Sequence, residues 1–399
     1  MRSKMTYIFG DIINKLFPFL LIPYLTNKLG VNDYSVIIVL ESYIAAIIVA
    51  MNFGQDSVIL KSKYKIRNTT LEHMFCNMLL WAFLVMLIGL FFMFFSGFSW
   101  NFFLVLIISL ATTIYVFQMT FLLSRKEAKK YFLFQNMNLV VSTLFTVIFF
   151  ELYSSSVEAR FISILASMSL VIFLLSFILK FNIPKLKLTR LKKFFFYQAL
   201  VGAPLMLHQL AFFFRTRGAN TLFSDSGTLN EFANFGLASQ LSLAIPLLCA
   251  AVYKAEAINI FSKLKSKTFN PADNGLNYLL ILFILAISVL TFILPSSFYE
   301  FIFGSDFLNL GSFLPYSIMV YCFYPLYLKY HNIAIYLDFS SQITLSALTG
   351  IIFSVTLIAL ILNFSLDMRF AYLSILVASM LGIICVKPFF YNHRKKISC

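Results

Sequence analysis

Charged residues are scarce in this sequence. Asp, Glu, Lys and Arg make up only 12% of the 399 residues, whereas hydrophobic residues make up 60% and the mean hydropathy is +0.88. Soluble domains carry about 25% charged residues. This shortage excludes water as the solvent for most of the protein surface, so we expect a membrane protein.

The sequence also lacks the patterns that hold disulfides, metals or nucleotides. Its five cysteines are dispersed and form no Cys-x-x-Cys pair, which argues against a disulfide framework or a metal site. His73, His331 and His393 lie near expected helix ends or in the tail without metal-ligand spacing. No Gly-x-x-x-x-Gly-Lys-Ser/Thr loop occurs, so ATP is not the local energy source. We expect no metal and no cofactor.

Acidic residues are fewer than basic ones, 16 against 31, which leaves a net charge of +15. Nucleic-acid binding would need a water-exposed basic face among stacking aromatics. The basic residues form short clusters between apolar runs instead, as the cytoplasmic loops of membrane proteins do. We therefore expect no nucleic-acid partner.

Long apolar runs dominate the rest of the sequence. Runs such as 79–95 and 276–294 are apolar on every face, whereas the strands of a membrane barrel would alternate. A spanning helix needs about 20 residues. The sequence predicts an all-α integral membrane protein with twelve transmembrane helices, near residues 5–25, 35–55, 74–95, 101–123, 131–150, 158–180, 196–222, 232–253, 275–295, 313–334, 341–362 and 370–388.

The basic residues indicate how these helices are oriented. With twelve spans, 25 of the 31 Lys and Arg residues fall in one set of alternate loops and three in the opposite loops. Cytoplasmic loops carry the excess of Lys and Arg. The sequence thus predicts that both termini are cytoplasmic. The loop after span 313–334 supports this orientation least, because we assign only Lys329 to it.

The spans are expected to form two halves of six helices. Residues 1–180 and 196–399 are joined by a basic linker, residues 181–195. Val31-Asn32-Asp33-Tyr34-Ser35 and Leu229-Asn230-Glu231-Phe232-Ala233 match in residue type at an offset of 198 residues. Equivalent helices of six-span repeats cross in the same direction, so an axis along the membrane normal would relate the halves around a central cavity.

Basic residues inside the expected spans are the first candidate site residues. A Lys or Arg at the centre of a span costs about 2.5 to 3.5 kcal/mol, so it usually faces a cavity or a partner. Lys15 shares a helix face with Asp11; it either forms an internal ion pair or offers a cation to an anionic substrate. Arg215 shares a face with His208, whereas Arg217 points elsewhere and would reach the outer interface.

Polar residues inside the spans complete the candidate site. Glu41 is either a proton or cation site or a hydrated, paired carboxylate. We group it with Asp11, His208 and Gln209 as residues that would line the cavity or couple an ion.

Four segments carry a family resemblance. Residues 23–34, Pro-Tyr-Leu-Thr-Asn-Lys-Leu-Gly-Val-Asn-Asp-Tyr, resemble the Pro-x-Leu-Thr-x-x-Leu-Gly-x-x-x-Tyr signature of Wzx-type polysaccharide flippases, in the multidrug/oligosaccharidyl-lipid/polysaccharide (MOP) superfamily. Asn52-Phe53-Gly54 followed by Lys61 resembles that family's end of helix two. Residues 202–205 resemble its Gly-x-Pro opening of helix seven, and residues 303–307 resemble its Phe-Gly-x-x-Tyr/Phe loop after helix nine.

Two positions depart from the family pattern. Many members carry an acid-Arg pair late in helix seven, where this chain has Arg215-Thr216-Arg217 and no acid, so a coupling role tied to that acid is in doubt. Lys61 stands where the family usually has arginine, which weakens a bidentate phosphate contact.

The resemblance implies a MATE-like fold and a transporter rather than an enzyme. Its substrate would be an undecaprenyl-pyrophosphate-linked oligosaccharide, an O-antigen or capsule repeat unit, moved across the bacterial cytoplasmic (inner) membrane by alternating access. The cations Lys15, Arg215 and Arg217 would bind the pyrophosphate. Partners would be membrane lipids, a polysaccharide polymerase and chain-length machinery. The residues that would meet the sugars are Asn14, Gln209 and Gln240.

Two alternatives stay open. An integral membrane polysaccharide polymerase or transferase has a similar composition but needs a long outer loop with catalytic residues, and the outer loops expected here are short. A drug exporter on the same fold would favour carboxylates in the cavity, whereas the central charges here are mostly basic.

Overall fold

The computed structural model describes residues 2–55, 68–125, 127–179, 188–224, 228–266, 268–270, 273–337 and 340–398. Every regular element in these ranges is a helix. The side chains of Asp11, Asn14 and Lys15 lie outside the described part, as does Lys61.

The chain divides into two compact units, residues 1–10 with 39–209 and residues 11–38 with 210–399. Two long helices, α1 (Arg2–Asn52) and α7 (Leu188–Thr216), contribute residues to both units. The units follow packing rather than chain order, and the expected division into halves at residues 181–195 stays a prediction.

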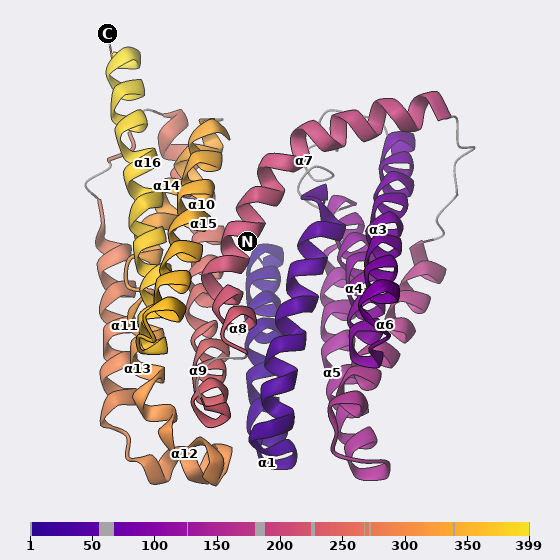
Figure 1. Ribbon diagram of the computed structural model, residues 1–399. Coiled ribbons are helices and arrows are strands. Elements are labelled where there is room, and N and C mark those ends of the chain that lie inside the picture. Colours follow the sequence, from indigo (N-terminus) through magenta and orange to yellow (C-terminus); the bar gives the residue numbers. More distant parts are fainter. Residues whose placement is uncertain are drawn as a thin grey trace. The chain divides into compact units, whose positions relative to one another are not determined.

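The first unit is built around a bundle of long helices, drawn in purple and magenta in Figure 1. Neighbouring pairs are α3 with α4, α4 with α6, and α5 with α6. Its core includes Met78, Phe117, Leu122, Val171 and Leu175, all almost fully buried. The bundle helices are α3 (Asn68–Ser96), α4 (Trp100–Ser124), α5 (Ala128–Leu152) and α6 (Val157–Leu179).

The second unit contains longer and shorter helices, drawn in orange and yellow towards the C-terminus (Figure 1). Within it α14 packs on α10 and α16, and α15 packs on α16. Tyr253, Tyr330 and Ile333 belong to its core. Its elements after α7 are α8 (Gly218–Leu222), α9 (Leu229–Ser242), α10 (Ala244–Lys265), α11 (Gly275–Ile293), α12 (Ser296–Phe303), η1 (Ser305–Ser312), α13 (Leu314–Met319), α14 (Tyr324–Tyr336), α15 (Ser340–Asn363), η2 (Met368–Tyr372) and α16 (Leu373–Ser398).

Helix surfaces in both units are apolar where a soluble protein would be polar. Phe92 and Phe95 of α3 are 66% and 70% exposed, and Leu282 and Phe292 of α11 are 67% and 68% exposed. Such continuous apolar faces suit hydrocarbon and would aggregate in water. The predicted all-α membrane class is thereby confirmed.

Among the described residues, nine helices are long and apolar enough to cross a membrane, or ten if one bent pair counts as a span. The predicted spans 5–25 and 35–55 lie on either side of the break at Gly30 in α1, which is counted as one of the nine. Span 196–222 coincides with α7 and α8, which are not among the nine. The count of twelve therefore stays a prediction.

The helices are broken at points that hydropathy predicts only in part. In α1 the backbone leaves helical geometry at Gly30, with φ +67° and ψ −175°, between the predicted spans 5–25 and 35–55. The expected helix 196–222 is interrupted at Arg217, between α7 and α8. Residues 320–323 separate α13 from α14 within the expected span 313–334. Hydropathy depends on side-chain composition and not on backbone angles, so it does not show where a helix is interrupted.

Candidate functional site

Arg215 is the central residue of the candidate site. It lies in the last turn of α7, and only 6% of its surface is exposed. Its guanidinium carbon lies 5.4 Å from the ring centroid of Tyr327, within range of a cation–π contact. The buried Nε and Nη2 atoms have no hydrogen-bond partner among the described residues. A buried charge in this state is costly unless an anion or another acceptor pairs with it.

Two glycines give Arg215 and Tyr327 their space. A Cβ atom added to Gly350 of α15 would lie 3.1 Å from Nη2 of Arg215. One added to Gly382 of α16 would lie 2.5 Å from ring carbons of Tyr327. The close packing of α15 and α16 therefore leaves room for a large cation and an aromatic ring, since both helices carry no side chain at these points.

One face of α14 lines the arginine with aromatic rings. Tyr324 lies 5.8 Å from Tyr327, and the imidazole of His331 stacks on Tyr327 at 5.6 Å, both between ring centroids. His331 lies within electrostatic reach of Arg215. The sequence pattern alone predicts no role for His331. Its spacing of seven residues from Tyr324 is the signal for a shared helix face, but nothing in the sequence connects that face with α7.

The other predicted site residues are divided between the two units. Glu41, His208 and Gln209 belong to the first unit, and each is half-buried. Arg217 belongs to the second unit, where it precedes α8 and donates its backbone N–H to the carbonyl of Phe213 at 2.8 Å. The predicted roles of these four residues remain untested, as do those of Lys15 and Asp11, whose side chains are not described.

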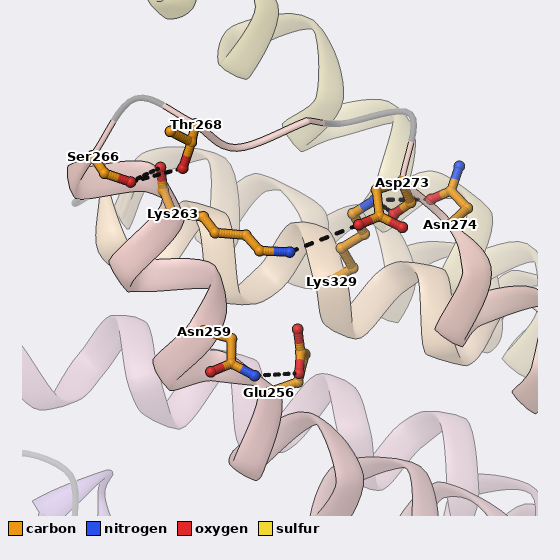
Figure 2. Close-up of polar contacts among 8 residues, drawn as sticks. All are labelled: Glu256, Asn259, Lys263, Ser266, Thr268, Asp273, Asn274 and Lys329. Carbon is orange, nitrogen blue, oxygen red and sulfur yellow. Dashed lines mark hydrogen bonds and ion pairs between the residues drawn. The ribbon is translucent and has the colours of Figure 1, made fainter.

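Lys329 provides a contrast to Arg215. The two are the buried basic residues of the described chain, with 4% and 6% exposure. The Lys329 ammonium donates to the carbonyl of Asp273 at 2.7 Å and to the Asn274 side chain at 2.8 Å, as Figure 2 shows. Lys263 adds an ion pair to Asp273 at 3.7 Å. Lys329 therefore fixes α14 to the start of α11, and its assignment to a loop was wrong, because it lies within α14.

Two of the segments that carry the family resemblance meet in the second unit. Asn27 donates to the carbonyl of Ile302 at 2.9 Å, and Asp306 accepts from the backbone N–H of Val31 at 3.3 Å. The ring of Tyr34 contacts Phe307 edge to face, with centroids 5.6 Å apart. Segments 23–34 and 303–307 thus form one junction. Gln240, a predicted sugar contact, accepts from the Tyr34 hydroxyl at 2.5 Å.

The other two segments meet in the first unit. Phe53 and Gly54 take positive φ angles of 49° and 67°, which ends α1. A Cβ atom added to Gly54 would lie 2.8 Å from the Gly202 carbonyl oxygen, and one added to Gly202 would lie 2.4 Å from that of Phe53. The indole of Trp81 donates to the carbonyl of Ala50 at 2.8 Å. Both pairs of segments therefore shape helix junctions.

Comparison with known proteins identifies the fold. No protein-family model matches the chain. An "uncharacterized membrane protein" of Haemophilus influenzae is 25% identical over 99% of this chain and 97% of its own length. An inward-facing MATE family transporter of the MOP superfamily superposes with a TM-score of 0.67 at 13% identity, covering 99% of this chain and all of that one. The lipid II flippase MurJ gives a TM-score of 0.64 at 16% identity, over 96% of this chain and 84% of that one.

The chain thus has the fold of MOP-superfamily transporters, and the predicted MATE-like fold class is confirmed. At these identities the likeness shows the fold alone. Membership of the Wzx-type family and the identity of the substrate are therefore matters of proposal.

Proposed function

We propose that this protein is a flippase that moves an undecaprenyl-pyrophosphate-linked oligosaccharide, an O-antigen or capsule repeat unit, across the cytoplasmic membrane. The observation that carries the proposal is Arg215, a buried arginine whose Nε and Nη2 lack partners within the described chain. A sugar diphosphate cannot cross hydrocarbon unaided, so the protein must offer it a polar path that opens alternately to each side.

A pyrophosphate suits this arginine in charge and in geometry. A guanidinium presents donors in a planar fork that binds phosphate oxygens two at a time. Two unit charges 4 Å apart attract by about 1 kcal/mol in water and about 4 kcal/mol at an effective dielectric constant of 20. Burial therefore lets one arginine hold an anion that water would otherwise screen.

We assign Lys15 and Arg217 as further cations for the pyrophosphate, on the strength of their positions in the sequence. Asp11, Glu41, His208 and Gln209 are proposed to line the path or to couple an ion. Binding by several cations must stay moderate, because a site that holds the anion too tightly would not release it.

The location follows from the same proposal. Both termini would lie in the cytoplasm of a bacterium, since the alternate loops expected on that side hold 24 of the 31 basic residues once Lys329, which lies within α14, is left out. A polysaccharide polymerase and its chain-length machinery would use the exported unit. Export of cationic drugs is the less favoured alternative, because Arg215 would repel them.

Complementation of a flippase-deficient bacterial strain tests this function. We expect the wild-type chain to restore surface polysaccharide, and Arg215→Ala to leave lipid-linked units accumulating in the cytoplasm at an equal amount of membrane-inserted protein. Arg125→Ala is the matched control, because Arg125 is exposed and rests on the ring of Phe121 at 4.3 Å. Normal surface polysaccharide with Arg215→Ala would contradict the assignment of this arginine.

A further inference from the structure

The second unit contains a pocket of about 720 Å³ that does not include Arg215. It is lined by the start of α9, by η1, by the end of α15 and by the segment that leads into η2. These segments are expected outer loops and helix ends, because the sequence orientation places residues 363–369 outside. Its volume is in the range of small-molecule sites, about 300 to 1,000 Å³.

The charges of the pocket are already held by partners. The Asp367 carboxylate accepts from Arg369 through its backbone N–H at 2.8 Å and its Nε at 2.7 Å. These hydrogen bonds hold the pKa of Asp367 below its ordinary value, so the carboxylate is ionised at neutral pH. Glu231 forms a capping box with Thr228, with both hydrogen bonds at 3.3 Å. The pocket is therefore rich in donors and acceptors without a strong field of one sign.

These charged groups limit the kind of ligand that the pocket can bind. A small anion would meet the carboxylates of Glu231 and Asp367, and a cation would meet Arg369. A purely apolar ligand would strip water from these three groups without replacing its hydrogen bonds. Hydroxyl groups both donate and accept, so a polyhydroxylated ligand can match carboxylate and guanidinium together. Leu362 and Leu366, which are 38% and 47% exposed, supply an apolar wall that the faces of a sugar ring can cover.

We propose that this pocket binds a saccharide, namely the sugar part of the translocated unit on the outer side of the membrane. The inference rests on the proposed function for its orientation and for the source of the sugar. It assigns separate roles within the second unit: Arg215 binds the pyrophosphate, and the pocket binds the glycan.

Saturation-transfer NMR on the full chain in nanodiscs tests the proposal. The probes are glucose, galactose, N-acetylglucosamine and rhamnose, each measured against empty nanodiscs. We expect transfer to at least one of these sugars. Ser312→Trp should abolish it, because Ser312 lines the pocket and the indole would fill it. Ser296→Trp is the matched control, since Ser296 is also exposed, starts α12 and does not line the pocket.

Asn309→Leu is a second pocket variant and should also weaken transfer. It keeps the test valid if Ser312→Trp misfolds. Transfer to none of the four sugars, or equal transfer with Ser312→Trp, overturns the proposal. The two proposals can fail separately. Restored surface polysaccharide without sugar binding would contradict only the saccharide pocket. Sugar binding without complementation would contradict only the flippase function.

Discussion

At the scale of single residues, Arg215 and Lys329 show two ways of burying a positive charge. Lys329 is surrounded by a carbonyl and an amide oxygen at hydrogen-bond distance. Arg215 has an aromatic ring beneath it and two nitrogens without a hydrogen-bond partner among the described residues. The first arrangement stabilises the fold by itself, and the second is complete only with an anionic or accepting partner.

The Lys329 contacts can be tested by substitution. In Lys329→Met the carbonyl of Asp273 loses its buried donor, which should lower the free energy of unfolding by about 1 to 3 kcal/mol. Thermal unfolding of the purified protein would show this as a lower midpoint. Lys263→Met is the control, because that ion pair is exposed and such pairs contribute about 0 to 1 kcal/mol. Equal midpoints for the two variants would show that Lys329 is not a structural contact.

The sequence sufficed to single out Arg215, because an arginine inside an apolar run is costly wherever it points. It did not reveal that Lys329 is buried. A lysine near the end of an apolar run looks the same in sequence whether it reaches water or turns inward to a carbonyl. His331 was missed for a related reason. It shares α14 with Tyr327, but Arg215 lies on α7, which is far away in the chain.

At the scale of elements, short motifs explain how helices end and meet. The matched segments 31–35 and 229–233 lie near one residue of η1: Val31 donates to the carboxylate of Asp306, and Asn234, which follows the second segment, donates to its carbonyl at 3.4 Å. The glycines of the motifs supply positive φ angles and close approaches that other residues would not tolerate.

The junction at Gly54 yields a prediction about packing. In Gly54→Ala the new methyl group would sit 2.8 Å from both the Gly202 carbonyl oxygen and the Leu205 Cβ. Overpacking of this kind costs about 1 to 3 kcal/mol. Gly97→Ala is the matched control, since Gly97 also has a positive φ angle, +97°, but open space around it.

We expect Gly54→Ala to lower the thermal unfolding midpoint more than Gly97→Ala does. Detergent-solubilised protein, monitored by the loss of the monodisperse peak in size exclusion after heating, is sufficient for this comparison. A smaller effect at Gly54 than at Gly97 would mean that backbone conformation, rather than the approach to Gly202, determines the cost.

At the scale of the whole molecule, hydropathy predicted the membrane class and the positions of the apolar helices. It separated the two helices that meet at Gly30, but it could not predict the breaks at Arg217 and residues 320–323, because transfer free energy depends on side-chain composition and not on φ and ψ. Nor did it predict the pocket of the second unit, whose polar residues come from several short segments. Each segment alone resembles an ordinary solvated loop.

Transport of the lipid-linked substrate in proteoliposomes tests the central claim most directly. Purified protein would be reconstituted with an undecaprenyl-pyrophosphate oligosaccharide that carries a fluorescent sugar, and its appearance in the opposite leaflet would be followed with a membrane-impermeant quencher. We predict translocation above protein-free liposomes for the wild type and for Arg125→Gln, and none above that background for Arg215→Gln. Equal translocation by Arg215→Gln and the wild type, or no translocation by the wild type, would contradict this account.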